Sequence, residues 1–253
     1  MNQLLLPQHY SGGATVSITG RDHHYLKHVL RLKPGDTLTG RDHDGAVYRL
    51  TVEREGEGEF VLRSVMQADS GQTAQSAFGY VLNLFQCLPK GARMDEIVRR
   101  ATELGVMRIV PLLSEFTVSR PPDRERAAKR AARWRRISKE ALQQSGAVRP
   151  PVIAEPTPLS AIENREDGCD LLFHVDREMG VSLHGMLAEG PRTINVLVGP
   201  EGGFSKREIT FILDSGFSPV CLGDTVLRVE TAAVAVISAV KTLLWERTDW
   251  TTA

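Results

Sequence analysis

Apolar and polar residues alternate in two different patterns along this chain, one before residue 68 and one after residue 77. Before residue 68 the apolar residues form short runs separated by glycine-bearing turns, a pattern typical of strands. The runs predict strands at 4–6, 14–18, 37–39, 47–52 and 60–65, and one short helix at 22–31. Asp44-Gly45, between two of these strands, is a strong hairpin signal. Several short strands joined in this way predict a small β-barrel.

After residue 77 strands alternate with helices. Strands are expected at 78–88, 107–113, 152–154, 171–175, 194–198 and 220–222, and helices at 93–104, within 120–149, at 158–163, after 205 and from 230. This alternation predicts an α/β domain with a mostly parallel sheet, whose ligands bind at the carboxyl ends of the strands. The polar segment 67–76 has linker composition, so the predicted domains are residues 1–68 and 77–253.

The first candidate binding loop is Gly199-Pro200-Glu201-Gly202-Gly203, directly after a β-branched run. Three glycines and a proline end the strand and let the backbone approach a ligand closely. Ser205, three residues before Glu208, predicts a helix that starts with a capping box. The Glu201 carboxylate would repel a phosphate, so a neutral or cationic ligand fits better. An ordinary β–α connection is the alternative.

The second candidate loop follows the strand at 220–222. Gly223 and Asp224 turn the chain, and Val226-Leu227-Arg228 forms another short loop. Glu230-Thr231 opens the next helix, whose residues Ala232 to Val240 are apolar on nearly every side apart from Ser238. This pattern predicts burial in a core or a subunit interface. Arg228 is either part of a structural ion pair or a functional cation.

Charge is distributed unevenly, although the 253-residue chain has a net charge of zero. Residues 120–149 contain ten Arg and Lys against three Asp and Glu, so this segment carries about +7 and the rest about −7. The one-signed excess favours contact with RNA; a solvated helix face is the alternative.

The cysteines and histidines predict no metal site. Cys87, Cys169 and Cys221 are far apart in the sequence, which fits a reducing compartment without a zinc site or disulfides. His24 and His28 share one helix face, but no further ligands follow at suitable spacing. Neither a signal peptide nor a membrane span is predicted, so we expect a cytoplasmic protein.

The two loops together carry a family resemblance. GPEGGFSKRE at 199–208, followed by LGDTVLRVETAA at 222–233, resembles the C-terminal signature of SPOUT-class methyltransferases. Within that class it is similar to the 16S ribosomal RNA uridine N3-methyltransferase family. The resemblance implies a trefoil-knotted α/β domain that binds S-adenosylmethionine, a homodimer, and a PUA-like RNA-binding β-barrel in front. The implied partner is 16S rRNA or the small ribosomal subunit, without a metal.

Resemblance and chemistry together suggest the site residues. Expected cofactor contacts are Phe173, His174, Gly199, Pro200, Glu201, Gly202, Gly203, Leu222, Gly223, Val226, Leu227, Arg228 and Thr231. Expected RNA contacts are Arg21, His24, Arg31, Lys90, Arg93, Arg120, Arg133, Arg136, Gln144 and Arg149. Lys90 and Arg93 match the family's first helix, although solvated charge explains them equally well.

The expected reaction requires uridine N3 to lose its proton. Arg228 would stabilise the negative charge that develops on the base. Glu201 or Glu230 would accept the proton, unless Glu230 only complements a helix dipole. Ribose 2′-O-methylation by the same fold and a non-catalytic RNA-binding assembly factor are the alternative functions.

Overall fold

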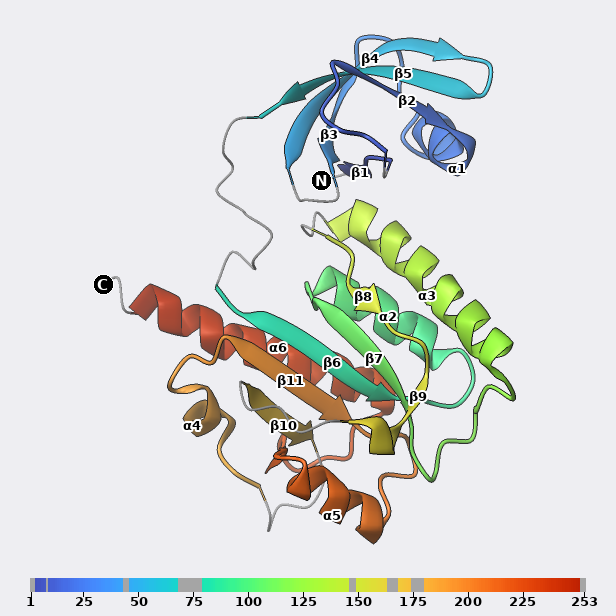
Figure 1. Ribbon diagram of the computed structural model, residues 1–253. Coiled ribbons are helices and arrows are strands. Elements are labelled where there is room, and N and C mark those ends of the chain that lie inside the picture. The colour runs from blue at the N-terminus through green and yellow to red at the C-terminus, as the bar shows by residue number, and fades with distance from the viewer. Residues whose placement is uncertain are drawn as a thin grey trace. The chain divides into compact units, whose positions relative to one another are not determined.

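The protein consists of two compact units (Figure 1). Met1–Ala77 and Leu142–Arg149 form the first unit, and Phe78–Ala141 and Pro150–Ala253 form the second. The structure, a computed structural model, describes residues 3–7, 9–42, 46–67, 79–145, 149–162, 168–173 and 180–250, without the side chains of 144, 145 and 247–250. Residues 68–76 of the proposed linker and the hairpin tip at 43–45 lie outside these residues, so the division into 1–68 and 77–253 stays a prediction.

The first unit is built on a mixed sheet. Its strands lie in the order β1(Gln3–Leu5), β3(Thr37–Arg41), β4(Val47–Gly56), β5(Glu59–Met66) and β2(Thr15–Thr19). β1 pairs parallel with β3, and the other pairs are antiparallel. Side chains alternate between core and solvent, as in β2, where Val16 and Ile18 are buried. A short helix, α1(Gly20–His24), continues into a π-helical turn, η1(Tyr25–Val29).

The second unit contains a parallel sheet, as the alternating pattern predicted. The described strands lie in the order β12(Ser218–Val220), β10(Cys169–Phe173), β11(Thr193–Val198), β6(Val81–Cys87), β7(Arg108–Leu113) and β8(Val152–Ile153), with β9(Thr157–Pro158) also beside β7. Residues 194–198 of β11 are all buried, because a parallel sheet is covered on both faces.

Helices cover both faces of this sheet. They are α2(Arg93–Glu103), α3(Arg124–Ser145), η2(Leu159–Ala161), α4(Leu183–Leu187), α5(Lys206–Asp214) and α6(Val229–Trp250). One core joins Leu84 and Val196 to residues of α2, α3 and α6. The other joins Phe85 and Leu197 to residues of α5 and η2. Successive side chains of a strand point to opposite faces of the sheet, so alternate residues pack against the helices on one face or on the other.

The expected burial of helix α6 in a core is met on one side within this chain, and burial of its other sides in a subunit interface stays a prediction. Only one face of the helix is buried, by Val229, Ala233, Val236, Ile237, Val240 and Leu244. On other faces Val234, Ala235 and Ala239 are half-buried, and Trp245 is 53% exposed. Among the described residues, no helix has the length and apolar character that crossing a membrane requires.

Candidate active site

The two glycine-bearing loops begin at the same edge of the parallel sheet. Phe173, the last residue of β10, pairs in register with Val198 at the end of β11 and with Val220 at the end of β12. Each loop starts one residue beyond its strand. Neighbouring strands are about 4.8 Å apart, so the loops leave the sheet roughly 10 Å from each other, on either side of β10.

A hollow that is partly open to solvent lies at the second loop, with about 500 Å³ of empty space when open solvent is included. Phe173, Val220, Cys221, Leu222, Gly223, Asp224, Thr225, Leu227, Ala232 and Val236 line it. Four of the expected cofactor residues are therefore brought together: Phe173, Leu222, Gly223 and Leu227. Val226 is 76% exposed and is not part of the lining, and Arg228 and Thr231 are exposed at the start of α6. His174 lies outside the described residues.

The first loop is a tight turn in which Gly203 has a positive φ of 68° and two other glycines are closely packed. The Gly203 amide donates to the Pro200 carbonyl at 2.9 Å, with Glu201 and Gly202 at the centre of the turn. A Cβ on Gly199 would approach the Phe204 ring to 2.9 Å. A Cβ on Gly202 would come within 3.1 Å of the Phe116 side chain. The turn therefore lies close against two aromatic residues.

The predicted capping box is present and also connects to a neighbouring loop. The Glu208 amide donates to the Ser205 hydroxyl at 3.3 Å, and the Ser205 amide donates to the Glu208 carboxylate at 3.0 Å. The other carboxylate oxygen of Glu208 accepts from the Glu115 amide at 2.7 Å. Helix α5 thus fixes the first turn and the loop after β7 together.

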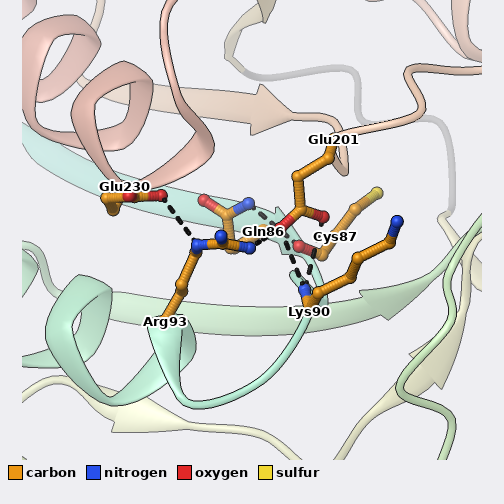
Figure 2. A network of polar contacts seen from close by, with 6 residues as sticks. All are labelled: Gln86, Cys87, Lys90, Arg93, Glu201 and Glu230. Carbon is orange, nitrogen blue, oxygen red and sulfur yellow. Dashed lines mark hydrogen bonds and ion pairs between the residues drawn. The ribbon is translucent and has the colours of Figure 1, made fainter.

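The carboxylate of Glu201 takes part in a polar network (Figure 2). It accepts from the Lys90 amide at 3.0 and 3.3 Å and from Nη1 of Arg93 at 2.5 Å. Nε of Arg93 lies 3.6 Å from Oε2 of Glu230, in the first turn of α6. Sequence analysis missed this network, because Arg93 and Glu201 are 108 positions apart and no local pattern connects them.

Beside this network a buried amide connects β6 to β11. Gln86 has no exposed surface, and its Nε2 donates to the Cys87 carbonyl at 2.9 Å and to the Val198 carbonyl at 3.4 Å. Two carbonyl acceptors fix the orientation of the amide group. Oε1 of Gln86 and Oε2 of Glu230 are buried without a hydrogen-bond partner among the described residues.

The three cysteine thiols differ in burial. Burial raises the pKa of Cys87 far above its usual range and that of Cys169 to about 11, so neither is a nucleophile near neutral pH. Cys221 is half-buried in the lining of the hollow, and its Sγ donates to the Gly223 carbonyl at 3.1 Å.

The expected RNA contacts are distributed over both units. In the first unit Arg21, His24 and Arg31 are exposed, His24 lies against His28 with ring centroids 4.4 Å apart, and Arg149 is half-buried. The side chain of Gln144 lies outside the described residues. Among those residues, no group of three His, Cys, Asp or Glu side chains is placed to hold a metal ion.

In the second unit a second hollow, with about 590 Å³ of empty space when open solvent is included, lies between the loop after β6 and helix α3. Leu88, Pro89, Gly91, Ala92, Met94, Asp95, Ser119, Arg130, Arg133 and Trp134 line it. Nη1 of Arg130 donates to the Ser119 carbonyl at 2.5 Å, and Nε of Arg133 donates to Asp95 at 3.1 Å. Arg120 bonds the carbonyls of Ser114 and Glu115, and Arg136 is exposed on α3.

Comparison with known proteins agrees with this geometry. Residues 78–241 match a family model described as an RNA methyltransferase domain. The parallel sheet, its glycine turns and this match define the class of the protein as RNA methyltransferases.

Similar proteins narrow the class. Ribosomal RNA small subunit methyltransferase E of Aquifex aeolicus is 34% identical, covering 84% of this chain and 89% of that protein. The protein of the same name from Synechocystis is 32% identical, covering 91% of this chain and 74% of that protein. The chain therefore belongs to the ribosomal RNA small subunit methyltransferase E family.

Solved structures are similar over nearly the whole length. Ribosomal RNA small subunit methyltransferase E from Neisseria gonorrhoeae, bound to S-adenosyl methionine, is 29% identical, with a TM-score of 0.84 and coverage of 96% of this chain and 98% of that one. A methyltransferase of Legionella pneumophila in complex with the same cofactor is 27% identical, with a TM-score of 0.83 and coverage of 95% and 96%.

Proposed function

We propose that this protein transfers a methyl group from S-adenosylmethionine to N3 of a uridine in 16S ribosomal RNA. The observation that carries the proposal is that both motif-bearing loops leave one sheet edge, on either side of β10. The second loop and Phe173 of β10 line a hollow there, whose lining includes no residue of the first loop. Relatives of the same fold bind this cofactor, according to their structures. A ligand at the carboxyl ends of parallel strands is also what this sheet type favours.

The residues of the edge fit this cofactor. Phe173, Leu222 and Leu227 offer apolar surface to an adenine ring, and the exposed backbone at Gly223 can meet its polar edge. Glu201, Glu230 and Arg93 together carry one net negative charge, which suits a cationic ligand. When bound, the cofactor supplies an electrophilic methyl group on a positively charged sulfur.

Arg228 is the residue we propose to stabilise charge on the substrate. Its side chain is exposed next to the hollow, and no ion pair engages it in the described part of the chain. Its carbonyl accepts from the Ala232 amide at 2.7 Å, so the first turn of α6 fixes its backbone. Once uridine N3 is deprotonated, negative charge spreads onto the base oxygens, where a guanidinium stabilises the transition state more than the ground state.

Of the two carboxylates suggested as proton acceptors, Glu230 fits better. The Glu201 carboxylate already accepts from Lys90 N and Arg93. Oε2 of Glu230 accepts no hydrogen bond from the described residues. Because N3 is paired in a duplex, the target uridine must be unpaired or flipped out.

Nucleoside mass spectrometry tests the function. Purified protein is incubated with S-adenosylmethionine carrying a labelled methyl group and with small subunits that lack the modification. We expect label in 3-methyluridine of 16S rRNA. Label in a 2′-O-methyl nucleoside would support the alternative ribose methylation, and an absence of label despite RNA binding would support an assembly factor.

We further propose that α3 and the second hollow contact the RNA backbone. Arg130, Arg133 and Trp134 all line this hollow. The Asp95 carboxylate holds two of these side chains in place, because it accepts hydrogen bonds from Arg133 and, at 3.2 Å, from Nε1 of Trp134. The loop that lines the hollow also carries Lys90, whose amide holds Glu201. Phosphates bound in the second hollow would therefore lie next to the first glycine-bearing loop, which contains Glu201.

The double substitution Arg130→Gln/Arg133→Gln tests this surface. Each lost phosphate contact should reduce the slope of log Kd against log salt by roughly 0.7 to 0.9. Filter binding to 16S rRNA at several salt concentrations measures this slope. Arg108→Gln/Arg192→Gln removes the same charge from the amino ends of β7 and β11, at the opposite sheet edge, and should leave the slope nearly unchanged. If both double variants have the same slope, the charged face of α3 contacts solvent rather than RNA.

Cysteine labelling tests cofactor binding without an activity assay. Below pH 8 a mild thiol reagent is expected to modify Cys221, while Cys87 and Cys169 stay protected by burial and raised pKa values. S-adenosylhomocysteine should slow the reaction, because Cys221 lines the hollow. Mass spectrometry of tryptic peptides locates the label, and Cys221→Ser serves as the control. An unchanged rate at saturating ligand would argue against this pocket.

The finer architecture is also part of the proposal. We infer a trefoil-knotted second domain, supported by the strand order β12-β10-β11-β6 and the family membership. A PUA-like barrel for the first unit is supported by its mixed sheet. A homodimer is supported by the half-buried apolar residues of α6 and by the exposed Trp245.

A further inference from the structure

Arg93 connects two parts of the site that are separate in the sequence (Figure 2). It is the first residue of α2, and its guanidinium lies between Glu201 in the first loop and Glu230 at the start of α6. The two contacts use different nitrogens, Nη1 at 2.5 Å and Nε at 3.6 Å. The planar fork of arginine presents separate nitrogens to the two carboxylates in a fixed arrangement, whereas lysine has a single nitrogen with rotatable donors.

Stability alone does not account for this arrangement. The side chains of Arg93, Glu201 and Glu230 are 44%, 27% and 24% exposed, and such partly exposed pairs stabilise a fold only weakly. The position of these three side chains matters more, because they connect the two loops. Glu201 belongs to the first loop, and Glu230 lies between Leu227 and Ala232, which both line the hollow. The position of one loop relative to the other therefore depends on Arg93.

Removing Arg93 would also leave an electrostatic imbalance. Oε2 of Glu230 is buried, and Arg93 is the cation that the described structure places beside it. Without the guanidinium, the carboxylates of Glu201 and Glu230 would face each other with no cation between them. Their repulsion would push the first loop and the start of α6 apart.

We propose that Arg93 is a positioning residue that sets the spacing of the two loops that hold the methyl donor. This role differs from the RNA contact expected from the sequence. The inference rests on the proposed function, because it assumes that both loops hold one ligand.

Arg93→Met is the test variant, with Arg99→Met, an exposed arginine of the same helix, as the matched control. We expect Arg93→Met to weaken S-adenosylhomocysteine binding about tenfold, a typical effect for coupled neighbours, and to leave RNA affinity unchanged. kcat/KM should fall by roughly a hundredfold, since a misplacement of about 1 Å at a reacting site costs that much. Calorimetry, RNA filter binding and steady-state kinetics measure the three effects.

A second substitution separates positioning from a general loss of structure. Adding Glu201→Gln to Arg93→Met removes the repulsion, so the double variant should bind S-adenosylhomocysteine more tightly than Arg93→Met alone. Weaker RNA binding with normal S-adenosylhomocysteine affinity would overturn the proposal in favour of an RNA contact. No recovery in the double variant would also overturn it. If the wild-type protein binds no S-adenosylhomocysteine, the proposed function itself fails.

Discussion

Arg228→Ala is expected to lower kcat for methyl transfer by about 10²–10³-fold, while the Kd for S-adenosylhomocysteine stays within about threefold of wild type. The reason is that the guanidinium would act on charge that exists only once N3 has lost its proton, so it contributes little to ground-state binding. Single-turnover kinetics with undermethylated small subunits, together with calorimetry, measure the two quantities separately.

Arg228→Lys and Arg207→Ala serve as controls for this prediction. Lysine keeps the charge but loses the planar fork, so an intermediate rate is expected. Arg207 is exposed on α5, and its removal changes net charge equally without touching the hollow. Wild-type turnover in Arg228→Ala would exclude Arg228 from the mechanism. A parallel loss of cofactor affinity would instead assign it to cofactor binding.

Asn195→Leu is expected to destabilise the protein by about 3 kcal/mol, the cost of leaving buried polar groups without a partner. Asn195 has no exposed surface and links three adjacent strands. Its Oδ1 accepts from Asn83 Nδ2 at 2.8 Å, and its Nδ2 donates to Asp170 Oδ1 at 2.5 Å. Leucine has the same branching at Cγ but can do neither.

Thermal unfolding measures this loss, which corresponds to a decrease in Tm of roughly 6–12 °C for a domain of this size. The adjacent substitution Ile194→Val removes only one methylene and should cost about 1 kcal/mol. A Tm for Asn195→Leu that is as high as that for Ile194→Val would contradict the predicted importance of the buried amide chain.

Local signals predicted much of the fold because they act over a few residues. The apolar stripe of α2 from Met94 to Ala101 is buried as predicted, and Gly105 follows the helix with φ of +74°. The Ser205 capping box forms as predicted. The strand expected at 220–222 lies two residues earlier, at Ser218–Val220, because pairing with β10 rather than composition sets the ends of so short a strand.

The sequence by itself determined the glycine turns, the helix starts and the parallel α/β pattern, because steric limits, capping and apolar periodicity are local. It also carried the motifs that indicated the family. Only the tertiary structure decided that Arg93 lies between Glu201 and Glu230, that Val226 is exposed, and that α6 buries one face. Those outcomes depend on which strand ends are neighbours in the sheet, and pairing between distant segments leaves no periodic trace in either segment.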